Sequence, residues 1–556
     1  MLGALLGAVG LTTAWCVPRI VRVLGGGPFA AAAARPVALS TTPAQPNASH
    51  APDRYILCTE TSCDGLPKVD CEPGAALIFT SQLFLDNSAS FLQRQSVPLE
   101  ADGDGDADRD SDLHIDVGSL ADTHGLLGFG AAFTDAAADT WASATPGLRA
   151  QMVRQYFGPD GIGYAIGRVP IGGTDFSTAA YTYDDGSPGD LALANFSVAV
   201  DEDSKLPLLH AALKLSPRLQ LLASPWSAPA WMKDSGKLVW GALIGEPGGP
   251  YYKAWASYLC RFLTEYARRG VRVSWLAVQN EPWYSLVTRF SVRWNSMAFT
   301  AERIRDFIKR DLGPALAAEH PQVKLMFHDD QRAQLMRVAG VVMADPEAAR
   351  HVSGAGFHWY DTMSFSWMGW GAIDALKYWE QVGQAARTWP ELTLIGTEAA
   401  EGFEGWARGP QLGSWWRLET YAYDMLKDLT QGAHGWMDWN LWLDSEGGPN
   451  WAANRCDAPL LLMPSGDAFV KQPTYYALAH FARFLPPGSR RLAVRAPAAL
   501  DAVAYLTPRP QRRVASVLLN KDTAEHCLRL RDVQRGRGFR LCMPPRSLHT
   551  VVWDVE

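Results

Sequence analysis

The stretch SWLAVQNEP, residues 274–282, contains the pattern from which the fold can be predicted. Its first half is apolar, and Asn280, Glu281 and Pro282 close it. A short apolar run of this kind is typical of a β-strand that is buried on both faces. A carboxylate placed where a buried strand ends needs a reason, and we interpret Glu281 as a group that carries out chemistry.

The same pattern recurs eight times between about residues 120 and 480, with longer segments of mostly helical character in between. The runs are GLLGFGAAFTD (125–135), IGYAIGRVPIGGTDF (162–176), LQLLASPWSAPAW (219–231), SWLAVQNEP (274–282), VKLMFHDDQ (323–331), GAGFHWYD (354–361), LTLIGTEA (392–399) and HGWMDWNLW (434–442). Eight strands that alternate with helices predict an α/β fold, the (β/α)8 barrel, whose reactive groups lie at the C-terminal ends of the strands. The residues near those ends are Asp175, Trp226, Glu281, Asp329, His358, Glu398 and Trp439.

The two ends of the chain follow another pattern. Residues 51–118 and 484–556 contain short alternating runs such as AALIFTSQLF (75–84) and RVASVLLN (513–520), with no helical pattern between them. Such runs favour antiparallel strands, and chain ends often lie close together. We therefore predict one accessory antiparallel β-sandwich domain built from both segments, beside a barrel at residues 119–483.

The N-terminal segment and the charge of the chain bear on its location. The first seventeen residues, MLGALLGAVGLTTAWCV, are apolar but short for a membrane span. Residues 1–50 are interpreted as a signal or targeting segment with a linker, and an uncleaved anchor is the alternative. Sequons at Asn47 and Asn195 favour the secretory pathway, ending in a lysosome, a vacuole or the extracellular space. The net charge of −7 argues against a nucleic-acid-binding protein.

The cysteines agree with an oxidising compartment. Cys58, Cys63 and Cys71 lie close together in the sequence, which indicates a small module tied by a disulfide. Cys527 and Cys542 lie in two short strand-like runs and are predicted to face each other in a hairpin. The acidic run at 100–116 lacks the glycine and the glutamate of a calcium-binding EF-hand loop, and the chain has no CxxC pair. No metal and no cofactor is expected.

Glu281 and Glu398 both follow apolar runs, and Pro282 is expected to keep Glu281 extended at the tip of its strand. In a barrel, two strand ends can bring such groups together however far apart they lie in the sequence. A pair of carboxylates on either side of a glycosidic bond is the machinery of glycoside hydrolysis. One protonates the leaving oxygen and the other attacks the anomeric carbon. A salt-bridge partner or a helix cap is the alternative role for each glutamate.

Several longer motifs carry a resemblance to a known family. GFGAAFTDAAA (128–138), GRVPIGGTDFS (167–177), LLASPWSAPAWMK (221–233) and GWMDWNLWLDSEGGPNWAANRCDAP (435–459) resemble glycoside hydrolase family 30, and the similarity runs from about Cys58 to the C-terminus. The resemblance implies a retaining mechanism, with Glu281 as acid/base and Glu398 as nucleophile. The positions that match the sugar-contacting residues of the family are Asp175, Phe176, Trp226, Asn280, Trp359, Trp439 and Asn454. His358 and Tyr360 are expected to hydrogen-bond to the catalytic carboxylates, and a structural role is the alternative for His358.

Within this family the motifs are most similar to members that cleave glucosylceramide. The resemblance therefore implies a retaining β-glucosidase that releases glucose and ceramide and needs no cofactor. One alternative is a family member that acts on a β-glucan, a xylan or a steryl glucoside. Another is a non-catalytic sugar- or lipid-binding protein on the same scaffold.

The expected partners are glucosylceramide at a membrane surface and a lipid-presenting activator protein. Residues 283–299 and 361–373 are rich in aromatic side chains, among them Trp283, Trp367 and Trp370. Exposed aromatic clusters mark interaction sites, and tryptophan favours the interface between water and lipid. The two segments are therefore predicted to contact lipid, and the alternative is that their side chains pack on each other.

Overall fold

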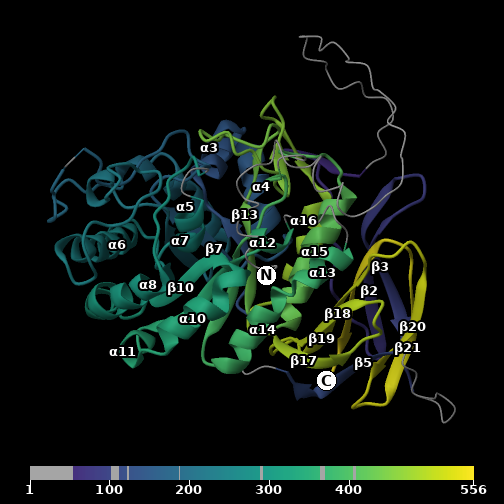
Figure 1. The fold of residues 1–556 in the computed structure, drawn as a ribbon. Coiled ribbons are helices and arrows are strands. Elements are labelled where there is room, and N and C mark those ends of the chain that lie inside the picture. Colours follow the sequence, from purple (N-terminus) through teal and green to yellow (C-terminus); the bar gives the residue numbers. More distant parts are fainter. Residues whose placement is uncertain are drawn as a thin grey trace, which may run out of the picture. The chain divides into compact units, whose positions relative to one another are not determined.

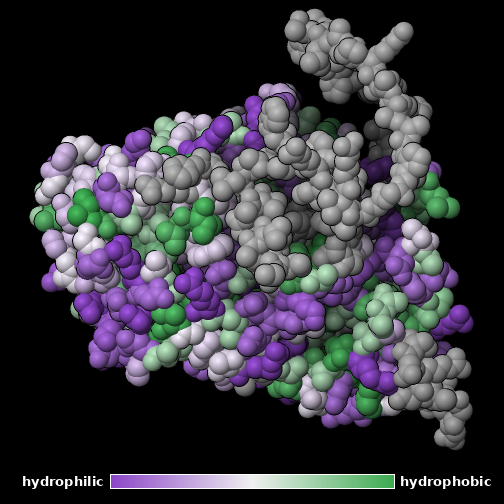
Figure 2. All heavy atoms as spheres, in the orientation of Figure 1, coloured by the Kyte–Doolittle hydropathy of each residue, from purple (hydrophilic) through white to green (hydrophobic). Residues whose placement is uncertain are grey.

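The computed structural model describes residues 54–101, 112–121, 124–186, 188–288, 292–363, 370–404 and 408–555. The predicted targeting segment, Asn47, most of the acidic run and Trp367 lie outside these residues. In the described part of the chain, no helix has the length and the apolar character needed to cross a membrane. On the face drawn in Figure 2, hydrophilic and hydrophobic residues are interspersed, as on most protein surfaces.

The eight predicted strands form a closed barrel of parallel strands (Figure 1). They are β6 (Gly128–Ala132), β7 (Ile166–Ile171), β8 (Gln220–Pro225), β9 (Trp275–Ala277), β10 (Lys324–Gln331), β11 (Val352–His358), β12 (Thr393–Glu398) and β13 (Gly435–Asn440). Every residue of β6, β7 and β13 is buried, as expected for strands covered by helices outside the barrel and filled by side chains inside it. The predicted fold is confirmed.

Helices connect the strands of the barrel. They are α3 (Asp135–Ser143), α4 (Pro146–Phe157), α5 (Lys205–Leu215), α6 (Pro250–Arg268), α8 (Ala301–Phe307), α9 (Gly313–Glu319), α10 (Leu335–Met343), α11 (Pro346–Ala349), α13 (Trp370–Leu376), α14 (Trp379–Thr388), α15 (Trp415–Thr430) and α16 (Pro473–Ala482). A capping side chain precedes several of these helices. In α3, the hydroxyl of Thr134 accepts a hydrogen bond from the amide of Ala137 at 3.0 Å.

The approach of β6 to β7 requires a glycine. Gly130 of β6 is paired with Ile166 of β7 in the barrel. A Cβ atom on residue 130 would lie 1.8 Å from the carbonyl oxygen of Ile166, far inside van der Waals contact. The barrel can therefore close at this point only because residue 130 has no side chain.

Both ends of the chain build the accessory domain, as predicted. Its ten strands are ordered β3-β2-β22-β19-β18-β17-β5-β20-β21-β4. They are β2 (Ala75–Leu83), β3 (Ala89–Pro98), β4 (Glu100–Ala101), β5 (Leu113–Leu120), β17 (Arg490–Arg495), β18 (Asp501–Leu506), β19 (Arg513–Asn520), β20 (His526–Asp532), β21 (Arg537–Met543) and β22 (Ser547–Asp554). Ile78 and Val551 from one half share an apolar core with Ile115 and Leu530 from the other, as in a β-sandwich. The pair β5 and β20 is parallel, against the antiparallel expectation.

Strand β1 (Ile56–Thr59) departs from the predicted organisation. It pairs with β16 (Ala468–Lys471) in a four-stranded sheet that also contains β15 (Leu460–Leu462) and β14 (Leu443–Asp444). This sheet belongs to the segment between the last barrel strand and α16, so β1 joins the barrel rather than the β-sandwich. The short apolar pattern of β1 does not show whether the strand pairs with β16 or with a strand of the β-sandwich.

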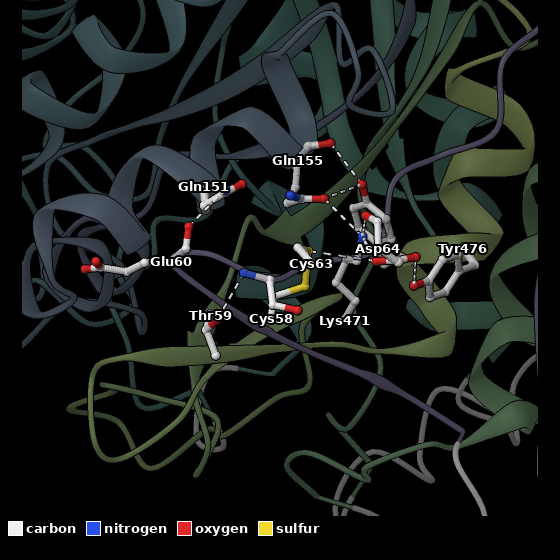
Figure 3. Close-up of a disulfide and its surroundings, with 11 residues drawn as sticks. Cys58, Thr59, Glu60, Cys63, Asp64, Gln151, Gln155, Lys471 and Tyr476 are labelled. Atoms are coloured by element: carbon white, nitrogen blue, oxygen red, sulfur yellow. Dashed lines mark hydrogen bonds and ion pairs between the residues drawn. A yellow bond between two sulfur atoms is a disulfide. The ribbon is translucent and has the colours of Figure 1, made fainter.

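The predicted disulfide module lies beside β1 and is shown in Figure 3. Cys58 is bonded to Cys63, and the neighbouring Asp64 forms an ion pair with the buried Lys471. Lys471 also donates to the side chain of Gln155 in α4 at 3.1 Å. The start of the described chain is thereby attached to the barrel.

Other contacts hold the β-sandwich. Cys527 and Cys542 form the predicted disulfide between β20 and β21. Arg546 donates to both carboxylate oxygens of Glu419 in α15, at 2.8 and 2.6 Å. A bidentate pair of this kind fixes orientation as well as distance.

The glycine at position 130 gives a test of the barrel. Gly130→Ala is expected to lower the free energy of unfolding by about 3 kcal/mol or more, because backbone must move to admit the methyl group. The matched control is Gly340→Ala in α10, where an added Cβ meets nothing within 4 Å. That change is expected to raise stability by about 0.5–1 kcal/mol. Thermal denaturation followed by circular dichroism measures both, and equal melting temperatures for Gly130→Ala and the parent would contradict the packing.

Candidate active site

Glu281 lies beyond the end of β9, in a segment that remains tied to both neighbouring strands. The amide of Asn280 donates to the carbonyl of Pro225 in β8, and the amide of Glu281 donates to the carbonyl of Asp329 in β10, both at 2.9 Å. These bonds keep the two side chains at the mouth of the barrel although the regular strand has ended at Ala277.

The backbone of Glu281 is not extended, so the prediction drawn from Pro282 is wrong. Glu281 has φ 45° and ψ 51°, in the left-handed region, and is the N-cap of the short helix α7 (Pro282–Val287). Proline is well suited to the first position of a helix, so α7 begins directly after Glu281. The chain therefore turns into the helix at Glu281, four residues after the regular strand has ended.

Glu398 is the last residue of β12, two strands away from β10 round the barrel. One carboxylate oxygen of Glu398 lies within 4.8 Å of one of Glu281, and both residues are 7% exposed. Retaining glycosidases hold their carboxyl groups about 5–5.5 Å apart, whereas inverting enzymes need roughly 6.5–9.5 Å for a water molecule. The separation agrees with a direct attack by one carboxylate.

The guanidinium of Arg168 links residues from four strands, and the sequence analysis missed it. Arg168 lies in β7 with its side chain fully buried. It forms an ion pair with Glu398, a second with Asp329 at 2.8 Å, and a hydrogen bond to the side-chain oxygen of Asn280 at 2.7 Å. The one available signal was an arginine inside an otherwise apolar run.

Three further side chains hold the carboxylates. Nδ1 of His358 lies 3.2 Å from Oε1 of Glu281, and the hydroxyl of Tyr360 donates to Oε1 of Glu398 at 2.9 Å. Both expected contacts are therefore present. The side-chain amide of Gln331 also donates to Oε1 of Glu281 at 2.9 Å, a contact that the sequence analysis did not anticipate.

The charged groups in this cluster shift one another's pKa values. Burial would raise the pKa of Asp329, but Arg168 and His358 hold it well below its usual range. Burial would lower the pKa of His358, but Glu398, Asp329 and Glu281 raise it to about 10. The two cations Arg168 and His358 thus both lie against Asp329, and each also contacts one of the two glutamates.

Glu281, His358 and Glu398 together offer three atoms that could bind a metal ion, all within 4.8 Å of one another. The imidazole can be a ligand only when it is neutral. Because its neighbours raise the pKa of His358 to about 10, the cluster favours a protonated His358 instead. The donor set therefore fits proton transfer better than metal binding.

A cluster of aromatic rings and a polar pair adjoin the charged groups of the site. The rings of Trp226 and Trp439 stack with centroids 5.1 Å apart, and the edge of Phe176 meets Trp439 at 5.9 Å. The side-chain amide of Asn454 donates to Asp175 at 2.8 Å, and burial raises the pKa of Asp175 to about 7. The structure thus brings five of the predicted sugar-contacting residues together as apolar rings beside a polar pair.

Trp359 packs in a different apolar cluster from Phe176, Trp226 and Trp439. Its ring is 1% exposed and packs edge-on against Tyr421 and Trp436 in the main core. Its indole nitrogen is buried without a hydrogen-bond partner among the described residues. A sugar hydroxyl could accept that hydrogen bond, so the predicted contact stays a prediction.

The two segments predicted to contact lipid differ in their surroundings. Trp370 of the second segment packs against Trp416 and Tyr423 of α15, with ring centroids 4.6 and 4.7 Å apart, a contact that neither the prediction nor its alternative described. The first segment contains most of α7, where Leu286 is 44% and Val287 47% exposed. These two residues lie within six positions of Glu281 along the chain.

Comparisons with known proteins agree with this geometry. Residues 126–485 match the family described as "Glycosyl hydrolase family 30 TIM-barrel domain". The lysosomal acid glucosylceramidase of Mus musculus is 40% identical over 430 residues, which are 77% of this chain and 80% of the mouse protein. An endo-1,6-β-D-glucanase of Trichoderma harzianum is 25% identical over 427 residues, 74% of this chain and 79% of that protein. The crystal structure of SrfJ from Salmonella typhimurium has a TM-score of 0.76 at 28% identity and covers 87% of this chain and 100% of SrfJ.

The role of Arg168 can be tested with Arg168→Lys, which keeps the charge but replaces the planar guanidinium fork with a compact ammonium group. The kcat for an aryl β-glucoside is expected to fall about 100-fold, the size of effect seen when one preorganised donor is lost. Arg168 lowers the pKa of Glu398 against the raising effect of burial. A weaker partner lets that pKa rise, so the acid limb of the pH profile is expected to move to higher pH.

The control is Arg332→Lys, because Arg332 is equally buried and pairs with Asp424 and Asp428 outside the carboxylate cluster. It is expected to lose stability without a shift of the acid limb. An unchanged acid limb in Arg168→Lys would contradict the role given to Arg168.

Proposed function

This chain belongs to glycoside hydrolase family 30, and we propose that it is a retaining β-glucosidase that hydrolyses glucosylceramide to glucose and ceramide. The observation that carries the proposal is the close pair of carboxylates, Glu281 and Glu398, at the mouth of the barrel. The 40% identity to a lysosomal acid glucosylceramidase supports the choice of substrate.

The geometry gives each carboxylate one task. Glu281 donates a proton to the glycosidic oxygen while an oxygen of Glu398 bonds to the anomeric carbon, and the bond to ceramide breaks. Water then attacks the glucosyl–Glu398 ester, and Glu281 takes the proton from that water. Arg168 and Tyr360 hold the carboxylate of Glu398 for the attack, because each donates to one of its oxygens.

The surrounding residues fit glucose. The oxygen of the Asn280 side chain is bound to Arg168, so its amide hydrogens are left to donate to the sugar. A bond from this position to the 2-hydroxyl strengthens at the transition state of retaining enzymes. Asp175 and Asn454 offer polar groups to the other hydroxyls, and Trp226 and Trp439 offer apolar ring faces.

The lipid part of the substrate calls for a different surface. Ceramide carries two long chains, and we place them at the rim, with the enzyme docked on a membrane or taking lipid from an activator protein. The exposed Leu286 and Val287 of α7 support this placement, because α7 begins at Pro282, directly after the acid. Apolar side chains in that position can enter the interface of a bilayer without disturbing the pocket. The mouse relative supports a lysosomal or secreted location.

The double-displacement mechanism can be tested by trapping its intermediate. A slow fluorinated β-glucoside is expected to label Glu398, found by mass spectrometry of peptides, because the intermediate is an ester of that residue. Glu398→Gln is expected to remain unlabelled. Glu281→Ala is expected to be rescued by azide with activated aryl glucosides, which need no proton. Label on another residue would contradict the assignment, and a folded chain with no hydrolysis of any β-glucoside would contradict the proposed activity.

The lipid-facing role of α7 can be tested with Leu286→Ser combined with Val287→Ser. Activity on glucosylceramide in vesicles is expected to fall about tenfold, because binding at the interface scales with the apolar area buried there. Activity on a soluble aryl β-glucoside is expected to change less than twofold. The control is Leu215→Ser, a 37% exposed leucine at the end of α5, which leads into the opposite end of the barrel. Equal loss on both substrates would show that α7 only supports the fold.

A further inference from the structure

The end of β10 carries two neighbouring aspartates on an irregular backbone. His328 and Asp329 have φ 73° and 54°, and the register between β10 and β11 shifts between His328 and Asp330. Two successive non-glycine residues in the left-handed region are costly, and such strain is concentrated at functional sites. The irregularity is a bulge, which redirects the side chains that follow it.

The carboxylates of Asp329 and Asp330, on either side of this bulge, contact different partners. Asp329 contacts Arg168 and His358 within the charged cluster. Asp330 accepts hydrogen bonds from the backbone amides of Trp283 at 2.7 Å and Tyr284 at 3.1 Å. A third amide, that of Gln331, donates to its other oxygen at 2.8 Å.

The first turn of α7 needs an acceptor from outside the helix. A helix leaves its first amide groups without partners, and the N-cap side chain usually accepts from them. The N-cap of α7 is Glu281, whose side chain makes no such bond. Its carboxylate is held instead by Gln331 and His358, in the position of an acid.

We propose that Asp330 is the positioning residue of the acid: it caps α7 in place of Glu281 and so holds the left-handed turn that leaves the Glu281 carboxyl group free to protonate the substrate. The carboxylate of Glu281 cannot cap α7 and point to the glycosidic oxygen at the same time. The bulge of β10 places a second carboxylate, that of Asp330, where it can cap α7. This inference rests on the proposed function.

The electrostatics of the pair agree with this division. The titratable groups that interact with Asp330 are Glu281, His358 and Tyr284. Burial and the charge of Glu281 raise the pKa of Asp330 to about 7, while the amide donors and His358 act against that rise. The two carboxyl groups are therefore close enough to influence each other, as expected if Asp330 holds the turn that carries Glu281.

The test compares substrates that differ only in their need for an acid. Asp330→Ala is expected to lower kcat/KM for phenyl β-glucoside at least about 30-fold, within the range that general acid catalysis contributes. The loss for 2,4-dinitrophenyl β-glucoside is expected to stay below about threefold, because this leaving group departs without a proton. Asp330→Asn keeps the volume and one acceptor but loses the charge. The alkaline limb of its kcat/KM profile against pH is expected to move to lower pH, because the negative charge beside the carboxyl group of Glu281 is removed.

The matched control is Asp345→Ala. Asp345 caps α11 with bonds from the amides of Glu347 and Ala348, at the end of the barrel where β11 begins. It is expected to lose stability with equal, small effects on both substrates. If Asp330→Ala does not fold, Asp330→Asn decides through its pH profile.

Equal losses of Asp330→Ala on the two substrates, or an alkaline limb of Asp330→Asn that stays in place, would overturn the inference. Failure of the proposed function is a separate result: the parent chain would then hydrolyse neither substrate, or Glu281→Gln would retain full activity on phenyl β-glucoside.

Discussion

Arg168 is a permanent positive charge that the barrel removes from water, and much of the site is arranged round it. Moving such an ion into a protein interior costs several kcal/mol unless its partners are well placed. Here Asp329 and Glu398 supply charge, and Asn280 supplies an uncharged acceptor. Since these partners lie at or just beyond the ends of three different strands, the guanidinium fixes the strand ends relative to one another. A cation held in this way orients the nucleophile before any substrate arrives.

The same arrangement explains why the two glutamates differ although they are chemically alike. Glu398 touches Arg168 and Tyr360, both of which donate to its oxygens. Glu281 touches Gln331 and His358, and the histidine is shared with Asp329. Both cations are shared with Asp329, but Glu398 accepts from a guanidinium and a phenol, whereas Glu281 accepts from an amide beside an imidazole. Different partners of this kind can separate a nucleophile from an acid within a single site.

Much of this could be predicted from the sequence, because it depends on periodic patterns and on residues at strand ends. The eight barrel strands, the β-sandwich and the positions of Glu281 and Glu398 follow from apolar runs that stop abruptly. Arg168 could not be recognised, since an arginine within a strand is meaningful only once its partners are known. The turn at Glu281 was missed because the rule for residues before proline favours extended backbone. The pairing of β1 with β16 depends on contacts between distant segments, which local patterns do not specify.

The configuration of the first sugar released tests the central claim most directly, namely that Glu398 attacks the anomeric carbon and Glu281 serves both half-reactions. Proton NMR of the reaction with an aryl β-glucoside can follow the two anomers before they equilibrate in water. Two successive displacements predict that β-glucose forms first and that α-glucose appears only later, through mutarotation. α-Glucose as the first product would show that water attacks directly, which would contradict the account.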